Sequence, residues 1–169
     1  MIGLLGGMLF ISGYSSALGS VASVAAWLSG LALVSSVLFA HYIRPVSLGA
    51  LAPPRPDMMA IYVASVIAEF ALINVGSRAL ASADLLHLRP ALIATVVGVH
   101  FIPFAWAFSE PMFYWLGGLV AALGVIGLTL GFVGVAHSPE AAAVTAGLTM
   151  QVIILLYARG RFARHTSVA

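Results

Sequence analysis

The sequence has 169 residues, of which 62% are hydrophobic and only 7% are charged. Soluble domains carry about 25% charged residues, so this chain cannot give a globule of its size a polar surface. The composition therefore predicts an all-α, polytopic transmembrane helix bundle with the lipid bilayer as its surroundings. Because cysteine is missing, disulfides and thiolate metal sites are excluded. No basic patch with interleaved aromatic residues indicates nucleic-acid binding.

The first uncharged run, residues 1–42, is about twice as long as the roughly 20 apolar residues that one membrane helix needs. It predicts two helices, over residues 2–18 and 21–42, separated by a cluster of small polar residues at 14–20. A cleaved signal peptide is the alternative for this run, but the positively charged start that such peptides carry is missing.

Four further spans are expected, and proline marks the breaks between them. The expected spans are 58–78, 90–108, 111–136 and 139–157. A proline-rich loop at 44–57 precedes the first of them. Pro90, Pro111 and Pro139 suit first turns, where the N–H that proline lacks would have no helical partner. Residues 159–169 form a basic cytoplasmic tail.

Six spans place both ends of the chain on the same side of the membrane. If that side is the cytoplasm, five arginines lie inside and two lie outside, in agreement with the positive-inside rule. The inside arginines are Arg44, Arg55, Arg159, Arg161 and Arg164, and the outside pair is Arg78 and Arg89. We therefore predict an N-in, C-in protein of the bacterial cytoplasmic membrane. The C-terminal arginines either contact anionic lipid or act only as a stop signal.

The span at 111–136 carries a stripe of glycines, which lets a neighbouring helix approach closely. The stripe consists of Gly117, Gly124, Gly127, Gly131 and Gly134. It predicts tight helix packing, either within the chain or with a second copy or another membrane partner. A flexible hinge is the alternative.

Three polar residues are expected near the middle of the bilayer, where ionisable groups are costly and are functional candidates by default. A rise of about 1.5 Å per residue from the span ends places Glu69, His100 and Gln151 close to the midplane. Tyr62 and Ser65 share one helical stripe with Glu69, and we expect this stripe to face the bundle interior. The depths permit a shared site but do not establish one.

Pro103 follows His100 by three residues within one predicted helix. A proline there lacks the N–H that would bond the carbonyl of Val99, and it favours a kink. Backbone groups that are freed at membrane depth need other partners. We therefore predict a polar pocket beside His100.

Two interpretations of Glu69 and His100 stay open. In one, they are a buried pair, with Gln151 as a third partner, that fixes the register of the helices. In the other, they bind a substrate or relay protons, because histidine titrates near neutral pH and a carboxyl group withdrawn from water can reach that range.

The leading functional hypothesis is a small transporter or permeation-type protein with a polar midplane site. The first alternative is a non-transporting membrane subunit or scaffold whose buried polar residues are structural. The second is a membrane-embedded enzyme that acts on lipid. The sequence contains no known catalytic motif, and it predicts neither a cofactor nor a metal.

Residues 100–117 read HFIPFAWAFSEPMFYWLG. The segment resembles a pattern of His-Phe-x-Pro-x-Ala, a short turn and an aromatic-glycine start in small uncharacterised multi-pass bacterial membrane proteins. The resemblance implies a bacterial inner-membrane protein with a domain of unknown function. It implies no substrate and no mechanism.

Overall fold

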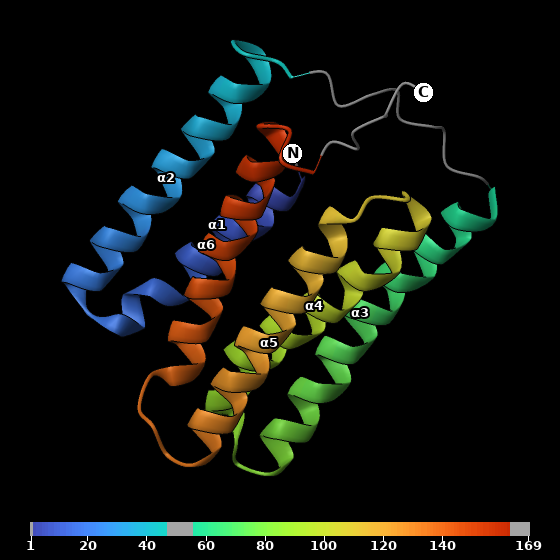
Figure 1. Cartoon of the computed structure of the whole chain (residues 1–169). Coiled ribbons are helices and arrows are strands. Elements are labelled where there is room, and N and C mark those ends of the chain that lie inside the picture. The colour runs from blue at the N-terminus through green and yellow to red at the C-terminus, as the bar shows by residue number, and fades with distance from the viewer. Residues whose placement is uncertain (1, 47–55, 163–169) are drawn as a thin grey trace.

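A computed structural model describes residues 2–46 and 56–162 as a bundle of helices (Figure 1). The long helices are α1 (Ile2–Tyr14), α2 (Ser20–Tyr42), α3 (Pro56–Ser82), α4 (Arg89–Ala107), α5 (Met112–Phe132) and α6 (Ser138–Ala158). Two short 3-10 turns are η1 (Ser15–Leu18) and η2 (Leu86–Leu88). No strand occurs in the described ranges, so the predicted all-α class is confirmed. The expected loop at 44–57 and the tail at 159–169 lie partly outside the described residues.

Five helices are long and apolar enough to cross a membrane, judged by length and composition. They are α2, α3, α4, α5 and α6, and the apolar segment of α4 also includes η2. The first apolar helix, Gly3–Leu18, is shorter. The 13 residues of α1 cover about 20 Å at 1.5 Å per residue, less than the roughly 30 Å of a bilayer core. A sixth span at residues 2–18 therefore stays a prediction.

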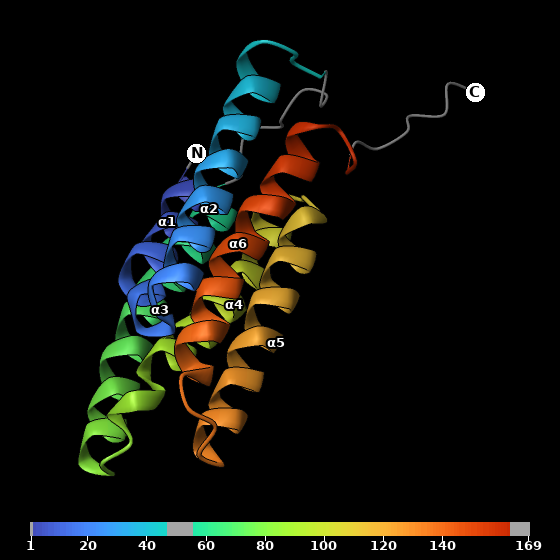
Figure 2. The ribbon, with the colours of Figure 1, turned by 90° about the vertical axis from the view of Figure 1, so that its left-hand side faces the viewer.

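The arrangement of the helices places α6 at the centre of the bundle, where it contacts α1, α2, α4 and α5. The view in Figure 1 shows α2 and α3 at opposite edges, with the other helices between them. Turned by 90°, the bundle shows α5 on the side away from α3 (Figure 2). The main contacts of α3 are with α4 and η2, so α3 is the most peripheral element near the predicted polar site.

The glycine stripe of α5 packs against other helices of the same chain. A side chain at Gly117 or Gly124 would collide with α4, and one at Gly127 or Gly131 would collide with α6. Without side chains at these positions, the three helices approach closely, and dispersion contacts between their backbones hold them together. These four glycines are therefore not free to receive a second copy or another partner.

Gly134 departs from the predicted stripe. It lies in the turn after α5 with a φ of +87°, and beyond its chain neighbours no atom of the described residues stands within 4 Å of the place a Cβ would take. The reason is that α5 ends at Phe132 and not at residue 136. Glycine suits this turn because it adopts positive φ without strain.

Candidate binding site between α3 and α4

The polar stripe of α3 faces α4. Tyr62 packs its ring on Phe104 with 4.9 Å between the centroids, Ser65 and Glu69 meet His100, and a side chain at Gly76 would meet α4. Spacings of three, four and seven residues place these positions on one helical face. The stripe thus lies at the α3–α4 contact, at the periphery of the bundle, whereas the sequence predicted that it faces the interior.

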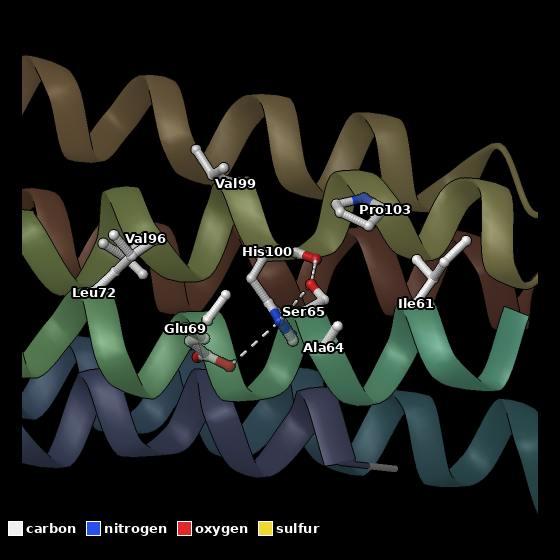
Figure 3. Close-up of a pocket in the computed structure, with 10 residues that line it drawn as sticks. Ile61, Ala64, Ser65, Glu69, Leu72, Val96, Val99, His100 and Pro103 are labelled. Carbon is white, nitrogen blue, oxygen red and sulfur yellow. Dashed lines mark hydrogen bonds and ion pairs between the residues drawn. The ribbon is translucent and has the colours of Figure 1, made fainter. Parts of the chain in front are cut away.

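Glu69 and His100 form the one ion-pair contact among the described residues (Figure 3). His100 Nδ1 lies 3.4 Å from Glu69 Oε2, and the two side chains are 9% and 17% exposed. This separation is longer than the roughly 2.7–2.9 Å of a tight charge-assisted hydrogen bond. The pair is therefore in contact but loosely joined, and small movements of α3 against α4 would open or tighten it.

Ser65 completes the polar contact and indicates which nitrogen of His100 carries a proton. The Ser65 hydroxyl donates to the backbone carbonyl of His100 at 3.1 Å, and its oxygen lies 3.3 Å from His100 Nδ1. A hydroxyl has a single proton, so the oxygen must accept at Nδ1. Both Ser65 and Glu69 therefore favour the tautomer that is protonated at Nδ1, and we assign it on that ground.

Ser65 bonds the carbonyl of His100, which is one residue after Val99, whose carbonyl the sequence analysis singled out. Pro103 was expected to free the carbonyl of Val99, whereas Ser65 donates to that of His100. The helix α4 runs through Pro103 without a break in its assignment. The hydroxyl of the neighbouring helix thus bonds a carbonyl next to the one that Pro103 leaves without its helical partner.

A groove of about 390 Å³ opens beside the pair. Apart from Ser65, Glu69 and His100, its lining is apolar and comes from both helices: Ile61, Ala64, Ala68 and Leu72 of α3, and Val96, Val99 and Pro103 of α4. Leu72 is 54% exposed and Val99 is 48% exposed. The groove is therefore open on the outer surface of the bundle rather than enclosed in its core.

Two polar atoms of the pair remain available to the groove. His100 Nε2 and the second carboxylate oxygen of Glu69 have no hydrogen-bond partner among the described residues. Neither atom belongs to the buried polar atoms that lack a partner, so both have exposed surface. In the assigned tautomer, Nε2 offers a lone pair and the carboxylate offers an acceptor. A ligand in the groove can therefore reach both.

Serine, histidine and glutamate meet here, but they do not have the geometry of a hydrolase triad. In a triad, the nucleophile hydroxyl and the acid bond opposite nitrogens of the imidazole. Here Ser65 and Glu69 both approach Nδ1 of His100. The hydroxyl is therefore not aligned with a free basic nitrogen, and the site favours binding over acyl transfer. No group of three potential metal-ligand side chains occurs in the described part of the chain.

Gln151 does not join this site. It lies on α6, fully buried, and its amide faces glycines of two other helices. A Cβ at Gly7 of α1 would lie 3.3 Å from its Nε2, and a Cβ at Gly30 of α2 would lie 3.6 Å from its Oε1. Neither amide atom has a hydrogen-bond partner among the described residues. The predicted midplane trio is thus divided between two regions.

The sequence predicts a polar pocket beside His100, but it does not predict that most of the groove's lining is apolar or that it opens on the outer surface, although a signal for the room on α3 exists. Ala64, Ala68 and Leu72 repeat every four residues beside the polar stripe, and they line the groove. Because alanine side chains are short, Ala64 and Ala68 leave room that larger side chains would occupy. A search for small residues next to a polar stripe would have indicated room at this position.

In comparisons with protein-family models, curated proteins and solved structures, no match was found. The resemblance of residues 100–117 to uncharacterised bacterial membrane proteins stays a prediction. The geometry and chemistry of the groove are therefore the basis on which a function is proposed.

Proposed function

We propose that this protein is a small membrane transporter that exchanges a lipophilic cation for a proton in the groove between α3 and α4. The setting is a six-span, N-in, C-in protein of the bacterial cytoplasmic membrane. Five apolar helices and a chain with 7% charged residues support membrane insertion. The positive-inside rule supports the orientation, because Arg44, Arg159 and Arg161 lie at the end opposite Arg78 and Arg89.

The contact between Glu69 and His100 is the observation that carries the proposal. With an ionised carboxylate and a neutral imidazole, the pair has one net negative charge. One added proton brings the net charge to zero, and so does one bound monovalent cation. In a weakly polarisable environment these two states are much more favourable than a site holding both charges. Proton and cation therefore compete, which is the requirement for exchange.

The lining of the groove supports a lipophilic substrate. Besides the pair and Ser65, every lining residue is apolar, and no arginine or second carboxylate takes part. Tyr62 lies nearby, with its ring against Phe104, but it does not line the groove. If α3 and α4 span the bilayer, the groove opens toward the acyl chains. An apolar body with one positive charge would fit this combination.

A second candidate function is a non-transporting membrane subunit in which the same residues are structural. The observation that favours it is the isolation of α3, whose apolar segment Met58–Ser82 has no buried residue in its most hydrophobic window. On this account, Ser65 and Glu69 hold α3 on α4 through His100, and the groove binds no substrate.

Uptake of ethidium into proteoliposomes tests the transporter proposal. With an acidic lumen, the purified protein should accelerate ethidium entry, and collapse of the pH gradient should stop it. Glu69→Gln should reduce the rate at least tenfold, because it removes the charge that both ligands neutralise, and His100→Ala should reduce it as well. Gln151→Met is the matched control, since it changes a polar residue outside the groove.

Ethidium entry that is independent of the pH gradient, or unchanged by Glu69→Gln, would contradict the proposal. If the unaltered protein moves no ethidium while Glu69→Gln lowers its thermal stability, the structural candidate is supported instead.

A further inference from the structure

A second groove, of about 660 Å³, lies at the end of the bundle where α2 and α6 both finish. In Figure 1 these two helix ends lie close to each other at the top of the molecule. The polar residues that line this groove are Ser35, Ser36, Arg44 and Arg159. The groove is far from the Glu69–His100 pair along the chain and shares no lining residue with it.

The charge of this groove is positive. The guanidinium of Arg44 lies 6.0 Å from the centre of the Phe39 ring, and neither Arg44 nor Arg159 has a carboxylate partner among the described residues. Each helix C-terminus contributes about half a negative charge. Two full positive charges exceed these two half charges, so the groove attracts an anion although two helices end there.

The two arginines come together because the segment after α2 packs on the turn after α6. A Cβ at Gly160 would lie 2.9 Å from Cγ1 of Val46, so the two segments are in close contact. Gly160 has a φ of +75°, which permits the tight turn that follows Arg159. Residues about 115 positions apart in the sequence thus form one anion-attracting surface, which neither segment forms alone.

The chemistry of the groove fits a phosphodiester. Arginine offers paired N–H donors that match phosphate oxygens. The Ser35 hydroxyl makes no hydrogen bond among the described residues, whereas the Ser36 hydroxyl donates to the carbonyl of Ala32. Ser35 therefore has a proton to donate to a bound anion.

We propose that this groove binds the phosphate headgroup of an anionic phospholipid. Phospholipid is preferred to free phosphate because apolar surface adjoins the arginines: Phe39 is 52% exposed and Val46 is 46% exposed. The groove lies at the end assigned to the cytoplasm, where anionic lipid attracts basic residues at the membrane surface. The proposal rests on membrane insertion and is independent of cation transport.

Native mass spectrometry of the purified full chain tests this site, with phosphatidylglycerol and phosphatidylcholine of identical acyl chains as probes. Phosphatidylglycerol should bind more tightly. Arg44→Gln and Arg159→Gln should each weaken its binding about fivefold, the factor that corresponds to about 1 kcal/mol per arginine at a membrane surface. Arg78→Gln is the matched control, because this exposed arginine lies at the other end of the bundle.

Three results would overturn the proposal. Equal affinity for the two lipids would show that the groove does not select charge. An equal loss in Arg78→Gln would show that total charge, and not this groove, controls binding. Displacement of phosphatidylglycerol by millimolar inorganic phosphate would identify a free-phosphate site. Circular dichroism of each variant would verify that its helices are retained.

Discussion

Two polar regions that were expected at the same depth have opposite surroundings. At the α3–α4 contact, Glu69 and His100 face each other beside an open groove of about 390 Å³. Around Gln151, three helices close completely, and the amide has no hydrogen-bond partner among the described residues. Depth along a helix therefore does not decide whether a polar residue is accessible; the packing of the neighbouring helices does.

The difference arises from the residues opposite each polar group. Gly7 of α1 and Gly147 of α6 bring their backbones together beside Gln151, with no side chain to separate them. Near Glu69 and His100, α3 packs against α4 alone. Alanines of α3 line the groove beside this contact. Glycines on both partners let the backbones of α1 and α6 meet, whereas the α3–α4 contact leaves a groove beside the pair.

The largest predicted effect is in the closed region. A Cβ at Gly7 would lie 2.7 Å from the backbone oxygen of Gly147, which cannot rotate away. We expect Gly7→Val to lower the free energy of unfolding by about 3 kcal/mol, the upper range for overpacked cores. Thermal unfolding in detergent measures this loss of stability. Gly118→Val is the control, because apart from its own helix backbone no atom of the described residues lies within 4 Å of its Cβ position. Equal stability of the two variants would contradict the close approach of α1 and α6.

A smaller loss is expected at the open contact. His100→Leu leaves the carboxylate of Glu69 without its partner, at a cost of about 2 kcal/mol. The double variant with Glu69→Leu should recover part of this loss, because both polar groups are then gone. A double-mutant cycle on the unfolding midpoint measures the coupling. Strictly additive effects would show that the two side chains do not interact.

The smallest effect, and the only gain, is expected at Gln151. Gln151→Met preserves the length of the side chain and removes an amide that has no described partner. We expect a stability gain of about 1 kcal/mol, the low end of the cost of an unpaired buried polar group. The unfolding midpoint of this variant, compared with that of the unaltered protein, gives the answer. A clear loss would mean that the amide makes a stabilising interaction.

Much of the bundle follows from the sequence, because the relevant signals are local. Hydropathy and proline positions predict the helices, and the 3-4-7 spacing of the polar residues predicts which face of α3 meets its neighbour. The glycine spacing likewise predicts a close approach along α5, and four of the five glycines lie against α4 or α6. Each of these signals depends on the periodicity of a single helix.

The separation of Gln151 from His100 did not follow from the sequence. Their predicted depths agree, but the position of one helix around another depends on contacts between distant segments, such as Gly7 with Gly147. The groove at the ends of α2 and α6 could not be predicted from the sequence for the same reason, since Arg44 and Arg159 come together only in the folded chain. Gly134 was misassigned because the helix stops before it.

Proton release on ligand binding tests the central claim most directly. Tetraphenylphosphonium would be added to the purified protein in weakly buffered detergent at a series of pH values from acidic to neutral, and a pH indicator dye would follow the protons. Competition at Glu69 and His100 predicts that binding releases protons, that Glu69→Gln abolishes the release, and that Gln151→Met retains it. Binding without proton release, or release that persists in Glu69→Gln, would contradict exchange at this site.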